Sequence, residues 1–237
     1  ARLIQIQRVL VRHGLDDFVR ETHLYRPLRF VFLASPWTWL ERRKEAPRAE
    51  RLRLALEELG PIFIKLGQAL STRRDLLPPD IAMELAKLQD RVPPFDNATA
   101  RAIIEKPLGR PVTESFATFE TQPLAAASIA QVHAATLKDG TDVVVKVLRP
   151  GMREIIQRDL IVMHELARLA RNNSAEARRL RIDEIVDEYE KTILDELDLM
   201  REAANASQLR RNFAGSDLLH VPEVYWDHCR VDVMVME

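Results

Sequence analysis

Cysteine is almost absent from this sequence. Cys229 is the only one among 237 residues, so the chain can build neither an internal disulfide nor a zinc site made of cysteines. The six histidines show no spacing typical of metal ligands, such as HExxH. We therefore predict no structural metal, and a reducing compartment fits best.

Glycine is scarce, and long apolar runs are missing. Seven glycines beside abundant Leu, Ala, Glu and Arg favour helices over a sandwich or barrel of many short strands. No apolar run approaches the roughly 20 residues that a membrane-spanning helix needs, and the first residues do not resemble a secretory signal. As given, the chain is predicted to be helix-rich and either soluble or peripheral to a membrane.

The charge is uneven along the chain. The net charge is −1, but residues 1–53 carry 12 Lys and Arg against 6 Asp and Glu. Apolar residues at helical spacing among arginines predict a basic amphipathic helix over residues 2–22. The aromatic stretch 30–40, with Trp37 and Trp39, lies between cations, which suits a lipid interface. The alternative, that this stretch packs on the rest of the protein, stays open.

The first 112 residues are predicted to be all-helical. A helical region over residues 49–74 is interrupted near Gly60-Pro61, and a second helix, over 80–90, has Asp80 as its cap. A short helix is expected after Asn97, ending at Lys106-Pro107 because proline disfavours helix in the residue before it.

The pattern changes after residue 112. Short strands are predicted at 116–120, 129–137 and 142–148, the last two joined by a hairpin at Asp139-Gly140. A helix to about residue 172 and a long helix over 182–213 follow, and strands at 223–226 and 231–236 complete the chain. Strands, helix and strands in this order are typical of a kinase small lobe. The predicted fold class is α+β, with residues 1–112 as a helical extension and 113–237 as the small lobe.

Lys146 ends an apolar run, Val143-Val144-Val145-Lys146. An unpaired buried charge is costly, so this lysine needs an anionic partner. Protein kinases use a lysine in this setting to hold the phosphates of ATP, with a glutamate of the next long helix as its partner. A strand-end lysine that extends to water is the alternative, and it is the better interpretation of this motif taken alone.

A turn rich in small residues precedes that strand. Small side chains let the backbone approach a triphosphate closely, although kinases use glycines here and alanine allows fewer conformations. An alanine-rich helical turn is the alternative. The candidate nucleotide-binding residues of this segment are Leu124, Ala125, Ala126, Ala127, Ser128, Ile129, Ala130, Gln131 and Val132.

Two further motifs make the sequence resemble one family. Lys65-Leu66-Gly67-Gln68 is similar to the KxGQ signature of the UbiB family of atypical protein-kinase-like proteins. Glu196-Leu197-Asp198 is similar to the family's ExD motif, and the segment 125–128 to its alanine-rich replacement for the glycine loop. All three stand in the family's order, and the resemblance runs from about Leu54 onward.

The resemblance implies a nucleotide site in the small lobe. Lys146 would hold the phosphates of ATP, Glu202 would be its helix partner, and residues 124–132 would form the loop over the nucleotide. On a continuous helix Asp198 and Glu202 share a face, about 40° apart. An exchange of Glu196 for Glu202 as the lysine's partner remains open.

The resemblance also implies a covered active site. Lys65 and Gln68 would lie over it, with Lys65 tied to Glu196 and Asp198, so that the extension blocks the groove for protein substrates. Such a protein is expected to hydrolyse ATP or to act on small or lipid molecules in ubiquinone biosynthesis. Its expected location is the cytoplasmic face of the bacterial inner membrane, and its expected partners are membrane lipids, ubiquinone precursors and biosynthetic proteins.

A kinase also needs a catalytic Asp, a metal-binding Asn and an Asp-Phe-Gly segment after its small lobe. None follows here, so we expect the Mg²⁺ ligands, the large lobe and any spanning helices beyond Glu237, and an inactive fragment without them. Alternatives are a non-catalytic kinase-like scaffold and a small-molecule phosphotransferase, although the latter is not expected to carry Lys65-Leu66-Gly67-Gln68. Nucleic-acid binding fits the near-neutral isoelectric point poorly.

Overall fold

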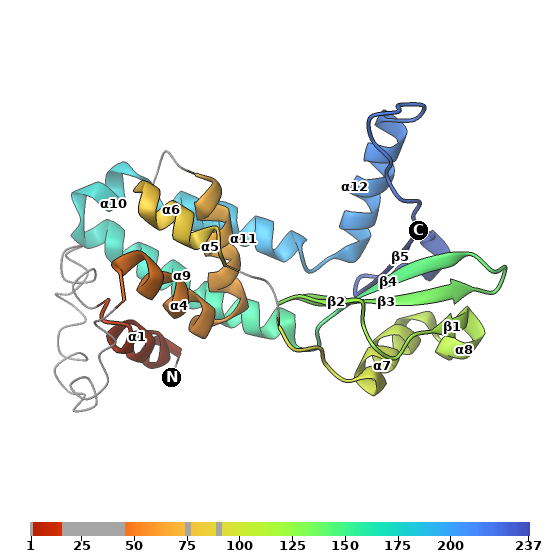
Figure 1. The fold of residues 1–237 in the computed structure, drawn as a ribbon. Coiled ribbons are helices and arrows are strands. Elements are labelled where there is room, and N and C mark those ends of the chain that lie inside the picture. The colour runs from red at the N-terminus through yellow and green to blue at the C-terminus, as the bar shows by residue number, and fades with distance from the viewer. Residues whose placement is uncertain (1, 16–45, 74–76, 89–91) are drawn as a thin grey trace. The chain divides into compact units, whose positions relative to one another are not determined.

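The structure, a computed structural model, describes residues 2–15, 46–73, 77–88 and 92–237. The chain forms two compact units that alternate along the sequence. The helical unit comprises residues 1–89 and 154–191, and the sheet unit comprises residues 90–153 and 192–237 (Figure 1). The single division expected at residue 112 stays a prediction.

Most of the described helices belong to the helical unit. Its described helices are α1 Arg2–Arg12, α4 Arg48–Leu59, α5 Pro61–Thr72, α6 Pro79–Leu85 and α10 Ala175–Arg179, with most of α9 Met152–Asn173 and α11 Ile182–Asp195. Ile64, Leu85 and Leu88 form a buried cluster against which leucines of α4 and α5 pack. The predicted interruption at Gly60 is confirmed: its φ of 101° ends α4 and starts α5.

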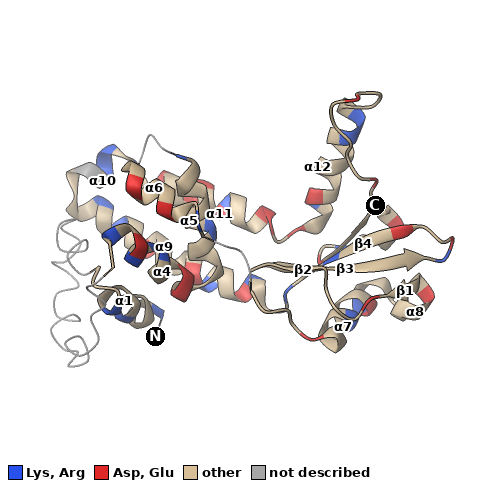
Figure 2. Ribbon diagram, in the orientation of Figure 1, with Lys and Arg blue, Asp and Glu red and all other residues tan. Residues whose placement is uncertain are grey.

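Arg2 connects helix α1 to two other helices of the helical unit, α9 and α4. The guanidinium of Arg2 donates two hydrogen bonds of 2.7 Å to the carboxylate of Asp159 in α9, and a third to the carbonyl of Leu59. Asp159 is fully buried, so this pair needs its full set of hydrogen bonds. Ile6 and Val9 are buried in the same unit, while cations lie along α1 (Figure 2). Ile6 and Val9 of the apolar stripe predicted as a membrane contact therefore belong to the protein core, whereas Leu3 is 43% exposed.

Two predicted helix boundaries are wrong. Helix α6 starts at Pro79 after Pro78, and Asp80 stands in its first turn without capping it, because the two prolines already set the helical entry. Helix α7, Asn97–Leu108, is capped by Asp96 and runs through Pro107. It ends at Gly109, whose left-handed conformation provides the stop.

The sheet unit is built on an antiparallel sheet. Its strands are β1 Phe116–Phe119, β2 Ala125–Ala126, β3 Ala130–Leu137, β4 Asp142–Leu148 and β5 Val233–Met236, in the order β1-β3-β4-β5, with β2 paired to β3. The predicted hairpin at Gly140 is confirmed. The unit also contains α8 Val112–Ser115, α12 Leu199–Asn212 and a 3-10 turn at Trp226–His228. Helix α7 contacts β4, and α12 contacts β5 (Figure 1).

The two faces of this sheet differ in burial. Gln131, His133, Val145 and Val147 are buried on one face, which we call the back face. Lys146 and its cross-strand neighbour Val132 lie on the opposite, front face, where both are only half-buried. Because side chains alternate along a strand, the front face is the one open to a ligand.

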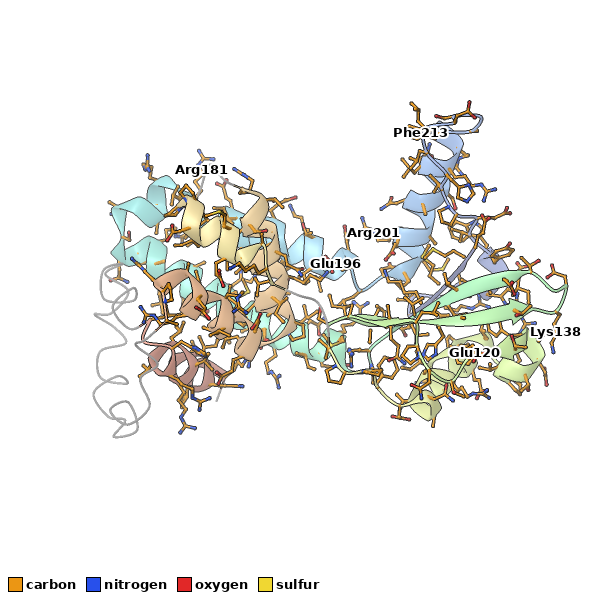
Figure 3. All side chains as sticks on the ribbon, in the orientation of Figure 1. Glu120, Lys138, Arg181, Glu196, Arg201 and Phe213 are labelled. Atoms are coloured by element: carbon orange, nitrogen blue, oxygen red, sulfur yellow. The ribbon has the colours of Figure 1, made fainter. Side chains whose placement is uncertain are left out.

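Two predictions near the end of the chain are wrong. The helix expected over 182–213 breaks into α11 and α12, with Glu196 in the turn between them (Figure 3). Asp198 caps α12, and the amide of Leu199 donates to the carbonyl of Val231. The cap and this tertiary hydrogen bond stabilise a turn, although the apolar residues continue at helical spacing through it. The strand expected at 223–226 is a single bridge, Val224 to Met236, because the 3-10 turn begins at Trp226.

Candidate functional site

Lys146 and Glu202 form an ion pair in the sheet unit. The ammonium nitrogen of Lys146 lies 2.6 and 2.7 Å from the two carboxylate oxygens of Glu202. Lys146 is held on β4 opposite Met234 of β5, and Glu202 lies in the first turn of α12. A carboxylate there also interacts favourably with the helix dipole. The structure thus answers the open question of partner: Lys146 contacts Glu202.

This pair is accessible to solvent. The Lys146 side chain is 26% exposed and that of Glu202 is 42% exposed. An ammonium on a partly exposed side chain can bind a second anion without the cost of a newly buried charge, while Glu202 fixes its direction. The arrangement fits a phosphate-binding lysine better than a lysine that merely extends to water.

The small-residue turn is a β-hairpin and not the helical turn that was the alternative. The amide of Leu124 donates to the carbonyl of Val132 and that of Ala127 to the carbonyl of Ala130, both at 2.8 Å. At the tip, Ser128 and Ile129 are buried. Of the predicted nucleotide-binding residues in this segment, Val132 shares the front face with Lys146, whereas the side chain of Gln131 lies on the back face.

The ExD motif forms the junction of α11 and α12. One carboxylate oxygen of Asp198 accepts from the amides of Met200 at 3.0 Å and Arg201 at 3.3 Å, as an N-cap does. Asp198 therefore precedes the helix that carries Glu202, and the argument that both share one helical face fails. The carbonyl of Leu197 also accepts from Arg153. The motif positions the start of α12 and, with it, Glu202.

The KxGQ motif lies on α5 in the helical unit. Gln68 donates from its side-chain amide to the carbonyl of Leu88 at 3.2 Å. A Cβ atom on Gly67 would stand 2.3 Å from the side chain of Leu88 and 2.9 Å from that of Leu56, so any larger residue requires these two leucines to shift. Lys65 belongs to the helical unit and both carboxylates of the ExD motif to the sheet unit, so the tie between them stays a prediction.

A buried polar network that motif reasoning did not find lies on the back face. The side-chain amide of Gln131 donates to Nε2 of His133 at 2.8 Å, and Nδ1 of His133 donates to the carbonyl of Glu120 at 2.9 Å. Phe119 stacks on the imidazole. Burial lowers the pKa of His133, although its bond to Glu120 opposes this. With the imidazole neutral, both ring nitrogens of His133 have a hydrogen-bond partner, Gln131 at Nε2 and the carbonyl of Glu120 at Nδ1.

The described part of the chain has neither a clustered set of metal ligands nor a membrane-spanning helix. Among residues 2–15, 46–73, 77–88 and 92–237, no group of three or more His, Cys, Asp or Glu side chains is arranged to hold a metal ion. Within these same ranges, no helix has the length and apolar character that crossing a membrane requires. Trp37 and Trp39 lie outside the described residues.

Comparison with known proteins covers the whole chain. This chain is 60% identical over 238 residues to a protein of Azotobacter vinelandii and 61% identical to one of Pseudomonas paraeruginosa. Both proteins are named "Probable protein kinase UbiB". All of this chain aligns, but only 44% and 45% of those relatives. The chain therefore spans less than half the length of the curated relatives it matches.

A solved structure aligns with most of this chain. The complex of Rv3197 with erythromycin from Mycobacterium tuberculosis aligns with 80% of this chain and 47% of its own, with 30% identity and a TM-score of 0.55. The family described as "ABC1 atypical kinase-like domain" matches residues 87–237. The resemblance to UbiB proteins inferred from the motifs is confirmed, and the chain belongs to the ABC1 atypical kinase-like family.

Proposed function

We propose that the full-length protein is an atypical kinase or ATPase that binds ATP through the front face of this sheet. The observation that carries the proposal is the ion pair of Lys146 and Glu202, at 2.6 Å, on the half-exposed face beside the hairpin turn 124–130. A lysine held by a helix glutamate is what kinases use to position the phosphates of ATP.

The residues present fit a triphosphate in charge and in shape. Lys146 supplies the cation, and the short side chains of Ala125 to Ala127 let backbone amides come close to phosphate oxygens. ATP itself would supply the transferable phosphoryl group. The ligands for Mg²⁺ are expected outside this chain.

The biological role follows from the relatives. Their UbiB name and the kinase-like family support a role in ubiquinone biosynthesis at the bacterial inner membrane. In this proposal Lys65, Gln68, Glu196 and Asp198 act over the nucleotide and restrict access to it. Lipid precursors, and not protein substrates, are then the molecules on which the activity is exerted.

The test is nucleotide binding by the full-length protein. Titration calorimetry with Mg-ATP is expected to show binding in the wild type and a loss of at least about tenfold in affinity in Lys146→Met, because a charged hydrogen bond to phosphate is removed. Lys138→Met, which removes an exposed lysine bonded to the carbonyl of Thr113, is the matched control. Binding that is absent in the wild type, or unchanged in Lys146→Met, would favour a non-catalytic scaffold.

A further inference from the structure

The hairpin turn is held from behind by an arginine. Arg149 follows β4 directly, and its backbone amide donates to the carbonyl of Ile129 at 2.7 Å. Its Nε donates to the carbonyl of Ala127 at 2.9 Å, and its terminal nitrogen donates to the carbonyl of Pro93 at 2.7 Å. One side chain therefore joins the tip of the turn to a segment 56 residues away in the sequence.

The same distant segment is held a second time. The side-chain oxygen of Gln131 accepts from the amide of Phe95 at 3.1 Å, and its nitrogen lies 3.4 Å from the carbonyl of Phe95. The guanidinium of Arg149 stands over the ring of Phe95 at 5.5 Å. Gln131 is also hydrogen-bonded to His133, which donates to the carbonyl of Glu120. These bonds on the back face fix the position of the Gln131 side chain.

Geometry explains why this support is specific. Arg149 donates to two carbonyls from different nitrogens of its guanidinium. The planar guanidinium holds these donors at fixed positions, whereas the single ammonium of a lysine does not. Gln131 is 1% exposed, so its bonds form in a buried setting where an unpaired partner is costly. Both contacts act on the backbone of the segment 93–95, which we call the strut.

We propose that Arg149 and Gln131 are positioning residues that hold the turn 124–130 against the strut, in the shape in which its backbone receives the phosphates of a nucleoside triphosphate. The proposal rests on the proposed function, because it names residues that prepare the same nucleotide site. Neither side chain touches the nucleotide. Where kinases use a flexible glycine loop, alanines in this chain are kept in place by contacts from the back.

The experiment measures affinity and local opening in the full-length protein. Arg149→Lys and Gln131→Leu are each expected to weaken Mg-ATP binding about tenfold in calorimetry, the equivalent of about one net hydrogen bond. Amide hydrogen exchange of residues 124–132 without nucleotide is expected to rise in both variants. Lys146→Met should leave this exchange unchanged, because it removes a phosphate contact and not the support.

A matched control separates support of the turn from general loss of stability. Arg230 also donates to backbone carbonyls, those of Pro107, Asp227 and Cys229, but it does not touch the turn. Arg230→Lys is expected to bind Mg-ATP as the wild type does, with unchanged exchange at 124–132. If Gln131→Leu does not fold, Phe95→Leu removes only the ring below the guanidinium and is expected to raise exchange at 124–132 in the same way.

The outcomes also separate this proposal from the proposed function. A wild-type protein that does not bind Mg-ATP overturns the proposed function. Amide exchange of residues 124–132 in the variants still tests whether Arg149 and Gln131 hold the turn. A folded Arg149→Lys or Gln131→Leu with wild-type affinity and wild-type exchange overturns the positioning role alone. Raised exchange with unchanged affinity would mean that the strut serves only the fold.

Discussion

At the scale of single residues, the structure separates side chains that face a ligand from those that prepare its site. Lys146 and Val132 share the half-exposed front face, while Gln131 and His133 are fully packed behind it. The motif around the turn contains both kinds, because neighbouring residues of a strand point to opposite faces. A sequence motif is therefore not by itself a set of ligand contacts.

The neutral state of His133 gives a prediction for pH. Burial holds its pKa below the usual value of about 6.5. Below that pH the unfolded chain binds a proton that the folded chain does not, so the free energy of unfolding falls as the pH drops. The contribution to the slope is at most about 1.4 kcal/mol per pH unit. Urea denaturation of the wild type and of His133→Gln, from pH 7.5 to 5, is the measurement.

The prediction concerns the difference in slope, and not the absolute stability, which His133→Gln also changes. The variant is expected to lose less stability on acidification than the wild type. Parallel curves for the wild type and His133→Gln would show that His133 is protonated in the folded state too.

At the scale of elements, the glycine of the KxGQ motif has a packing reason. Gly67→Ala places a methyl group 2.3 Å from Leu88 and 2.9 Å from Leu56, and overpacking of this kind costs about 1–3 kcal/mol. Alanine gains up to about 1 kcal/mol in helix propensity. We expect a net loss of about 1 kcal/mol in the free energy of unfolding, measured by urea denaturation.

The control for Gly67→Ala lies two residues further on the same helix. Ala69 is exposed, so Ala69→Gly should lower stability by up to about 1 kcal/mol through propensity alone. If propensity also governed position 67, Gly67→Ala would raise stability, and that result would contradict close packing in α5.

The ExD motif gives a prediction that separates structure from chemistry. Asn is as good an N-cap as Asp, so Asp198→Asn should keep the free energy of unfolding, while Asp198→Ala should lose about 1 kcal/mol. In the full-length protein the proposed role needs the charge, and Asp198→Asn should then lose ATPase activity at unchanged stability. Activity of Asp198→Asn equal to that of the wild type would reduce the role of Asp198 to capping.

The sequence predicts elements well where local signals agree. Strand β4 begins and ends at the predicted residues because a turn glycine precedes it and Pro150 follows it. The break before α12 was missed because the apolar stripe continues through it. The turn is fixed by a bond from Arg153 to the carbonyl of Leu197 and by one from Leu199 to the carbonyl of Val231, and both partners are distant in sequence. Arg149 was missed for the same reason, since its partners lie 22 and 56 residues away.

At the scale of the whole molecule, α1 limits how this chain can meet a membrane. Ile6 and Val9 are buried, and Arg2 is bonded to Asp159, so this part of the helix serves the fold of the helical unit. Ile6→Ala is accordingly an expected stability variant and not a membrane variant. Apart from the exposed Leu3 and Ile4 of α1, a candidate source of membrane affinity is the basic and aromatic sequence between α1 and α4, with Trp37 and Trp39.

The last prediction is that residues 1–237 bind anionic vesicles weakly and in a salt-sensitive way. The first 53 residues carry 12 cations against 6 anions, and each cation near an anionic surface contributes about 1 kcal/mol. In co-sedimentation, Trp37→Ala with Trp39→Ala should lower the bound fraction, as should added salt, because interfacial tryptophans and charge act together. Trp226→Ala, which removes a tryptophan that is 43% exposed in the sheet unit, should bind as the wild type does. Equal recovery in the supernatant with anionic and neutral vesicles would assign Trp37 and Trp39 to the protein core.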